Sequence, residues 1–214
     1  MDTLLLVRHA FAGSNRDGNA SCAVPGEGLT PEGIEQARSL VGALSAEEIA
    51  VAVTSRLART QETLALALDG REVPVVVVPE LDEIDFGSFT EGPLDTYRAW
   101  AAAHPPDRRA PGGGESRADA AARFARGLRV VLARDEATIL LVGHALALRY
   151  VLDAAEGLPP VAVMTPVEHA FPYRLGCADV ERAAALLEAW SRTPRFRDHS
   201  NEGRGGGPHS RPPP

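Results

Sequence analysis

The chain has 214 residues, of which 44% are hydrophobic and 24% charged, and these values suit a single soluble α/β domain of ordinary size. No run approaches the ~20 apolar residues of a membrane span, and no signal peptide precedes the first predicted strand, so we expect a cytoplasmic protein with no membrane partner. A formal net charge of −7 disfavours binding to nucleic acid, because phosphate backbones bind basic surfaces.

All 22 basic residues are arginines, and the chain contains no lysine. A P-loop needs a lysine on the phosphates and a pyridoxal enzyme needs one for its Schiff base, so both classes are excluded. Any anion site must be built from arginine, histidine and backbone N–H groups. The two cysteines, Cys22 and Cys177, are far apart in the sequence, which argues against a disulfide framework and a cysteine zinc site.

The first half of the chain predicts strands alternating with helices. The apolar run at residues 3–7 predicts a strand buried on both faces, and the Gly-, Ser- and Asn-rich stretch 13–28 predicts a loop. Thr30-Pro31-Glu32 marks a helix start. We expect that helix to bury Ile34, Ala37, Val41 and Leu44, and further elements to follow as a strand at 49–54, a helix at 57–68 and a strand at 73–78.

The second half continues the alternation after an irregular segment, ELDEIDFGSFTEG. Ser116 is the expected cap of a long helix with an apolar face of Phe124, Leu128, Val131 and Leu132. The other predicted elements are a short helix at 94–103, a loop at 104–116, a strand at 138–142, a helix from 145, a strand at 170–175 and a helix at 179–190. We expect one domain over 1–193 and a disordered Arg/Gly/Pro-rich tail over 194–214.

This alternation predicts a three-layer α/β/α fold with a mostly parallel, doubly wound sheet, in which ligands bind at the carboxyl ends of the strands. Three predicted strands end in polar residues, namely Arg8-His9, Ser55 and Gly143-His144. A single histidine at a strand end is more often a structural residue. Two at one edge favour a shared pocket, in which the imidazoles face each other if their strands are neighbours.

Arg59, in the segment SRLART, follows Ser55 by one helical turn. An isolated arginine on a helix is usually solvated. Together with Arg8, however, it would supply the pair of guanidinium groups that suits a bound phosphate.

Several motifs resemble those of the histidine phosphatase superfamily: LLLVRHAFAGSN, GLTPEGIEQA, VTSRLARTQET, ELDEIDFGSFTEG, GGGES and LLVGHA. They cover roughly residues 3–150 in the family's order. The resemblance implies a phosphoglycerate mutase-like fold. It also implies a covalent phosphohistidine mechanism that uses neither a metal nor another cofactor.

Residue by residue, the resemblance assigns His9 as the nucleophile of the family's RHG motif, which reads RHA here. It assigns Arg8 and Arg59 to phosphate binding and His144 as the second histidine of the pocket. Glu83 matches the proton donor, with Asp82 and Asp85 as rival acids, and Asn15 matches a phosphate-contacting residue. Ser55 and Phe11 are further expected substrate contacts.

The resemblance also separates phosphatases from mutases. Mutases of the family carry an acid two residues after the nucleophile and a lysine, whereas this chain has Phe11 there and no lysine. We therefore favour hydrolysis of a small-molecule phosphomonoester. The alternatives are a cofactor-dependent phosphoglycerate mutase and a regulatory or binding member with little turnover.

The sequence leaves the substrate, the oligomeric state and the role of the tail open. Aromatic residues either line the mouth of the pocket or pack a lid against the core, namely Phe11, Phe86, Phe89 and Trp100. Arg108 and Arg109, in a loop with Glu115-Ser116 that resembles broad-specificity and α-ribazole phosphatases, either meet a second anionic group or lie in solvent, and we favour solvent.

Overall fold

The computed structural model describes residues 1–197, which form a five-stranded mixed sheet with the order β3-β2-β4-β1-β5. The parallel strands are β1 (Thr3–Arg8), β2 (Val51–Thr54), β3 (Val75–Val77) and β4 (Thr138–Gly143). Strand β5 (Pro172–Gly176) runs antiparallel to β1 at one edge. The predicted α/β fold with a mostly parallel sheet is confirmed.

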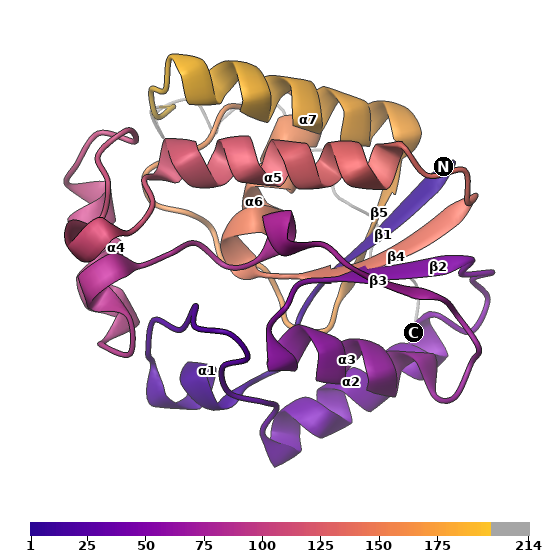
Figure 1. Cartoon of the computed structure of the whole chain (residues 1–214). Helices are drawn as coiled ribbons and strands as arrows, with labels where there is room; N and C mark the ends of the chain where they lie inside the picture. Colours follow the sequence, from indigo (N-terminus) through magenta and orange to yellow (C-terminus); the bar gives the residue numbers. More distant parts are fainter. Residues whose placement is uncertain (198–214) are drawn as a thin grey trace.

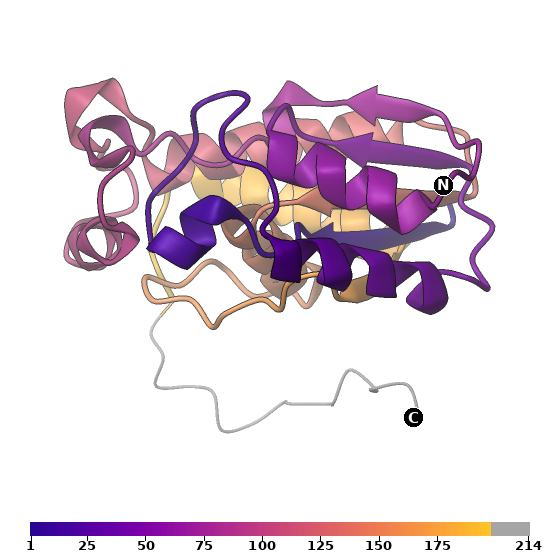
Figure 2. The ribbon, with the colours of Figure 1, turned by 90° about the horizontal axis from the view of Figure 1, so that it is seen from below.

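Helices cover both faces of this sheet (Figures 1 and 2). One face carries α5 (Arg117–Leu132), α6 (Ala145–Ala155) and α7 (Cys177–Arg192), and the other carries α2 (Pro31–Ala43) and α3 (Ala58–Leu68). Two shorter helices, α1 (Gly13–Asp17) and α4 (Leu94–Ala102), lie beyond the end at which β1 finishes (Figure 1).

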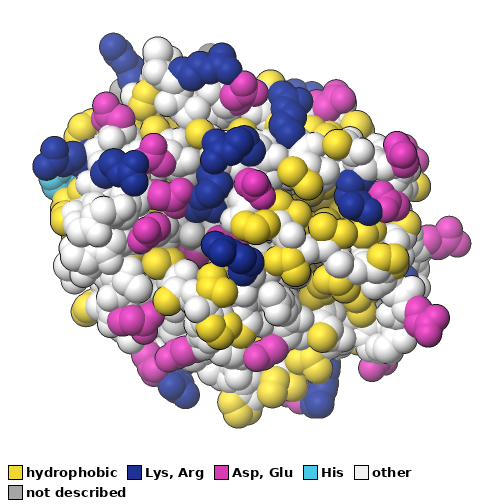
Figure 3. All heavy atoms as spheres, viewed as in Figure 1, with side chains coloured by type: hydrophobic (Ala, Val, Ile, Leu, Met, Phe, Trp, Pro, Cys, Tyr) yellow, Lys and Arg dark blue, Asp and Glu magenta, His cyan; other side chains and the backbone are white. Residues whose placement is uncertain are grey.

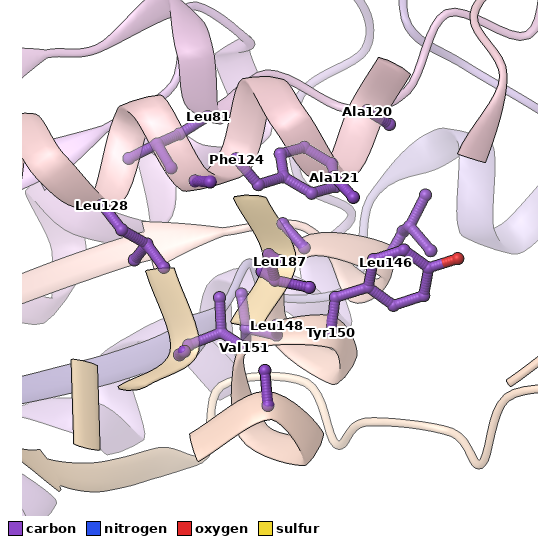
Figure 4. Close-up of a cluster of buried hydrophobic side chains, with 14 of the residues drawn as sticks. Leu81, Ala120, Ala121, Phe124, Leu128, Leu146, Leu148, Tyr150, Val151 and Leu187 are labelled. Carbon is purple, nitrogen blue, oxygen red and sulfur yellow. The ribbon is translucent and has the colours of Figure 1, made fainter. Parts of the chain in front are cut away.

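The continuous apolar runs of the central strands follow from this three-layer arrangement. In β1, Leu4 and Leu6 belong to the core cluster under α5, α6 and α7, whereas Leu5 and Val7 belong to the cluster under α2 and α3. Neighbouring side chains of a strand point to opposite faces, so a strand covered on both faces has no polar positions. Figure 4 shows the larger cluster, where α5, α6 and α7 meet around residues such as Phe124.

Some predicted elements differ in extent. The helix α1 lies inside the predicted loop 13–28, where the Asn15 side-chain oxygen accepts a hydrogen bond from the Ala12 N–H (3.0 Å). The strand predicted at 73–78 is only Val75–Val77. It is an edge strand, with Val75 and Val77 53% and 45% exposed, and hydrophobic side chains gather on that side of the molecule in Figure 3.

The face that α2 buries also differs in part from the prediction. Ala37 and Leu44 are buried as expected, but Gly33 and Leu40 are buried where Ile34 and Val41 were expected, and these two are half-buried. The buried face of α2 is therefore rotated slightly, which brings Gly33 against the loop that carries the strand-end histidine.

The C-terminal segment continues beyond the predicted domain boundary at 193. The Trp190 indole N–H donates to the carbonyl oxygen of Arg195 (2.7 Å), and the Phe196 ring lies 6.0 Å from that of Trp190. Residues 195 and 196 thus contact α7, and the predicted tail from residue 198 onward lies outside the described residues.

Two glycines of α2 give a matched test of this packing. A Cβ on Gly33 would lie 1.9 Å from the carbonyl oxygen of Phe11, whereas a Cβ on Gly42 would meet no atom within 4 Å. We expect Gly33→Ala to lower the free energy of unfolding by about 1–3 kcal/mol through overpacking. Gly42→Ala should raise it by roughly 0.5–1 kcal/mol, because alanine favours helix. Urea denaturation measures both, and equal effects would contradict this account of α2.

Candidate active site

Three neighbouring strands bring their polar ends to one edge of the sheet. Strands β2, β4 and β1 are adjacent and parallel, so Ser55, His144 and His9 follow at the same end. Both histidines are buried, His9 at 3% and His144 at 0% exposure, and their ring centroids lie 5.3 Å apart. The structure therefore brings together the residues that the strand ends singled out.

The hydrogen bonds of His9 define its tautomer. The Arg59 Nε–H donates to His9 Nε2 (3.2 Å), so this nitrogen carries a lone pair, because a guanidinium group can only donate. The proton is then on Nδ1, which donates to the carbonyl oxygen of Ala10 (2.8 Å). Burial, reinforced by the Arg59 and Arg8 charges, holds the pKa of His9 well below its ordinary value of 6.5. A neutral imidazole with its lone pair in the pocket is suited to nucleophilic attack.

His144 is held by a directed chain of hydrogen bonds. Arg59 Nη2 donates to His144 Nδ1 (3.3 Å), so the opposite nitrogen, Nε2, carries the proton and donates to Ser55 Oγ (2.9 Å). Ser55 in turn donates to Thr60 Oγ1 (2.8 Å), whose own hydroxyl donates to the carbonyl oxygen of Leu57 (2.7 Å). Ser55 therefore orients His144 from behind.

The two arginines of the site have unused donors. Arg59 is 2% exposed, and its Nη1 has no partner. Its Nη2 donates both to His144 and to the carbonyl oxygen of Ser21 (2.9 Å). Arg8 donates from Nη1 to the carbonyl oxygen of Val167 (2.7 Å), and its buried Nε has no partner. Burial lowers the pKa of Arg8 to about 10, so it remains a cation at neutral pH. Buried donors without a partner are costly, and a bound anion would satisfy them.

Glu83 is the acid whose surroundings suit proton transfer. Burial raises the pKa of its carboxyl group above 4.5, and the nearby Arg59 and Arg8 charges partly oppose that rise. Its backbone is fixed by Arg123, whose Nη2 donates to the Glu83 carbonyl oxygen (3.2 Å), and its own Oε1 accepts from the Ile84 N–H (3.0 Å).

The rival acids are occupied or exposed. Asp82 accepts hydrogen bonds from the backbone N–H and the Nε of Arg56 (2.8 and 2.7 Å) and forms an ion pair with that side chain (2.6 Å). Asp85 is exposed, and its carboxylate accepts from the Gly87 N–H (2.9 Å).

The remaining predicted residues lie around the site in different ways. The side-chain oxygen of Asn15 is bonded to Ala12, and no hydrogen bond joins Asn15 to His9, Arg8 or Arg59 in the described part of the chain. Phe11 is half-buried, with its ring 5.5 Å from that of His169.

The other expected aromatic residues contact one another, which favours the lid alternative. The Phe86 and Tyr97 ring centroids lie 4.7 Å apart, and those of Phe89 and Trp100 lie 5.5 Å apart. Arg109 forms an ion pair with Asp119 (3.1 Å), and Arg108 is exposed.

Sequence reasoning missed two contacts of the nucleophile loop. His169 donates from Nδ1 to the carbonyl oxygen of His9 (2.7 Å), with its ring 5.5 Å from the His9 ring, and burial lowers the pKa of His169 to about 4. Thr63, on α3, accepts from the Ala10 N–H (2.9 Å). His169 lies in an irregular segment with no motif around it, so nothing in the sequence indicated its contact. Thr63 lies four residues, or one helical turn, after Arg59, so helix periodicity could have predicted that it faces the same loop.

The model of the histidine phosphatase superfamily (branch 1) matches residues 4–189. The chain belongs to this superfamily. It is 35% identical over 105 residues to an adenosylcobalamin/alpha-ribazole phosphatase of Escherichia coli, and the alignment covers 45% of this chain and 51% of that protein. It is 30% identical over 168 residues to the "Probable phosphoglycerate mutase GpmB" of Proteus mirabilis, and the alignment covers 73% of this chain and 76% of that protein.

The solved structures give the same likeness. The alpha-ribazole phosphatase of Shigella flexneri superposes with a TM-score of 0.69 at 27% identity, over 80% of this chain and 89% of that one. The match to the Escherichia coli phosphatase spans only about half of that relative's length.

Among residues 1–197, no helix is long and apolar enough to cross a membrane. No group of three or more His, Cys, Asp or Glu side chains in the same range is arranged to hold a metal ion.

Proposed function

We propose that the chain hydrolyses a small-molecule phosphomonoester through a phosphohistidine formed on His9. The observation that carries this proposal is the lone pair on His9 Nε2, bordered by guanidinium donors that have no partner on Arg8 and Arg59. Family membership and the likeness to phosphatases support the same reaction.

In the first step, His9 Nε2 attacks phosphorus as the ester P–O bond breaks in line with it. The N–P bond forms, and Glu83 gives its proton to the leaving oxygen, so that a neutral alcohol departs. The positive charge that develops on the His9 ring is delocalised toward Nδ1, whose proton is held by the carbonyl oxygen of Ala10.

In the second step, Glu83 takes a proton from water, whose oxygen attacks phosphorus as the N–P bond breaks. Inorganic phosphate leaves, and both His9 and Glu83 return to their starting protonation states. Through both steps the phosphoryl oxygens carry negative charge, which Arg8, Arg59 and His144 stabilise by donating hydrogen bonds. His144 can donate to the phosphate only when its Nδ1 gains a proton in place of the hydrogen bond that it accepts from Arg59, and the negative charge of the phosphate opposes the burial and the Arg59 charge that hold the pKa of His144 well below 6.5.

The likeness to GpmB keeps a phosphoglycerate mutase as the second candidate. Two features of this chain favour hydrolysis. The position two residues after His9 is Phe11, whose ring contacts His169, where mutases of the family carry an acid, and the chain lacks the lysine that those mutases have. Incubation with 3-phosphoglycerate and its bisphosphate primer separates the two, since rapid interconversion of the isomers without phosphate release would overturn hydrolysis.

A regulatory member with little turnover is the third candidate. Such a protein has no need to keep all the catalytic groups, yet the described site keeps both histidines, both arginines and the acid. Release of inorganic phosphate from p-nitrophenyl phosphate tests turnover directly, and its absence would leave the regulatory alternative standing.

The role of Glu83 is tested by comparing leaving groups. An alkoxide needs a proton, whereas p-nitrophenolate leaves without one. We therefore expect Glu83→Gln to lower kcat/KM by about 10²–10⁴-fold for an alkyl phosphate such as glycerol 3-phosphate. The loss for p-nitrophenyl phosphate should be much smaller. Equal losses on the two substrates would contradict proton donation by Glu83.

The pH dependence follows from the raised pKa of Glu83. The acid form acts in the first step, so that step slows as pH rises through this pKa, at a higher pH than for an ordinary carboxylic acid. In Glu83→Gln this alkaline fall in the rate of alkyl phosphate hydrolysis should disappear. Its persistence in the variant would assign the titration to another group.

A further inference from the structure

A cavity of about 420 Å³ adjoins the proposed phosphate site, because Arg8 forms part of its wall. The rest of the wall comes from α4, the first residues of α5 and α6 and the segment 162–167, and it is largely apolar, with residues such as Ala99, Val163 and Met164. Three guanidinium groups interrupt this apolar wall, those of Arg8, Arg98 and Arg117, and no acidic residue lines the cavity.

Arg117 is a buried cation without an anionic partner. It is 6% exposed and forms no ion pair with an acid in the described part of the chain. Its Nη1 donates to the Tyr150 hydroxyl (3.3 Å) and contacts Met164 Sδ (3.7 Å), while its buried Nε has no partner. Figure 4 shows the phenolic oxygen of Tyr150 pointing out of the hydrophobic cluster, so the pair stands at the border of the core.

The position of Arg117 in the chain adds to the free-energy cost of burying its charge. It is the first residue of α5, where the backbone N–H groups of the helix already present positive charge. Arg117 lacks a carboxylate and is compensated only in part by the Tyr97 ring, whose centroid lies 5.6 Å from its guanidinium carbon, so an anion from outside the chain would stabilise it.

Arg98 is available for the same anion. Its ion pair with Asp95 (3.0 Å) is exposed on both sides, at 60% and 90%, and exposed pairs of this kind contribute little. A smaller cavity of about 60 Å³ is lined by Arg98 and Arg117 together with Glu83, the proposed proton donor. The two arginines therefore lie on the side of the site that receives the leaving alcohol.

We infer that this cavity binds the alcohol half of the substrate, and that this half carries a second anionic group, a carboxylate or a phosphate, held by Arg117 and Arg98. The inference rests on the proposed function and narrows its substrate class. A purely apolar alcohol would contact the apolar wall formed by α4 and the segment 162–167, but it would leave Arg117 without an anionic partner. An alcohol with an apolar body and an anionic end satisfies both kinds of surface.

The test compares two substrates that share a reacting centre, benzyl phosphate and 4-carboxybenzyl phosphate. We expect wild-type protein to favour the carboxylated ester in kcat/KM by roughly tenfold or more, as for a charged hydrogen bond. In Arg98→Gln and in Arg117→Met, a substitution that keeps an apolar side chain of similar length, this ratio should fall toward 1. Arg126→Gln, at an exposed position of α5, is the matched control and should keep the wild-type ratio.

The outcomes separate the inference from the proposed function. Hydrolysis of benzyl phosphate with no preference for the carboxylated ester would overturn the inference and leave the phosphatase standing. Arg98 is exposed, so we expect its substitution to be tolerated. If Arg98→Gln lowers kcat/KM equally for the two substrates, the inference is also overturned. If neither ester is hydrolysed, the proposed function fails and the inference fails with it.

Discussion

His9→Ala is expected to lower kcat/KM for p-nitrophenyl phosphate by at least ~10³-fold, because the covalent route is lost with the nucleophile. The nearest other imidazole, His144, is held in place by donating from Nε2 to Ser55, so we do not expect it to replace His9. Release of p-nitrophenolate at substrate concentrations well below KM measures the loss.

Two controls accompany this variant. His104→Ala removes a histidine whose ring stacks on Trp100 (4.7 Å) outside the site and should retain wild-type activity. The thermal unfolding curve of His9→Ala must show a folded protein, since His9 is buried at 3% exposure. A folded His9→Ala protein that keeps normal hydrolysis would refute the assignment of the nucleophile.

Arg59 is expected to have the second largest effect, because one guanidinium group contacts both histidines. Its Nε donates to His9 (3.2 Å), its Nη2 to His144 (3.3 Å), and its Nη1 is left for the phosphoryl group. We expect Arg59→Met to lower kcat/KM by about 10²–10³-fold, comparable to the removal of a donor from an oxyanion hole.

The conservative variant sharpens this prediction. Lysine keeps the charge but has a single ammonium group, which cannot reach two imidazoles and a phosphate in the fixed geometry of the guanidinium fork. Arg59→Lys should therefore recover less than a tenth of the lost activity, whereas Arg126→Gln should be unaffected. Full recovery by lysine would mean that Arg59 supplies charge alone.

The pH profile of the nucleophile provides a further expectation on the same residues. In the proposed mechanism the neutral ring of His9 attacks, and burial together with Arg59 and Arg8 holds its pKa well below 6.5. Activity should therefore persist as pH falls through 6.5 and decline only at lower pH, where the ring gains a proton. In Arg59→Met, one of the two opposing charges is absent, so the acid limb should shift to higher pH.

The sequence predicted the layers because the central strands are buried on both faces. The apolar side chains of Leu4 to Val7 are buried only if helices cover both faces of the sheet. This pattern predicted a buried strand that ends at Arg8 and His9, at the edge where ligands of such sheets bind. The same pattern put His144 at that edge, but the sequence left open whether its strand lies beside that of His9, and the structure shows that β1 and β4 are neighbours. The strand ends thus indicated which residues share a site, whereas the roles of these residues came from the family resemblance.

What the sequence could not predict depends on contacts between distant segments. His169 reaches the His9 backbone across 160 positions, and the segment that carries it has no helical or strand periodicity. Arg117 follows a Ser cap and has the sequence context of a surface residue of a helix, and it is buried because Tyr97, Tyr150 and Met164 pack around it. The edge strand Val75–Val77 is shorter than its β-branched sequence suggests, because only one neighbour, β2, pairs with it.

The central claim is that the phosphoryl group passes through Nε2 of His9. The measurement that tests it most directly is rapid acid-free quenching after mixing with ³²P-labelled substrate, followed by peptide mapping of the labelled protein. We expect an acid-labile, base-stable label on the peptide that contains His9 and none in His9→Ala. With p-nitrophenyl phosphate, whose leaving group needs no proton, Glu83→Gln should carry more label, because the loss of the base slows attack by water. A label on any other residue, or steady hydrolysis by wild-type protein with no label at all, would contradict the account.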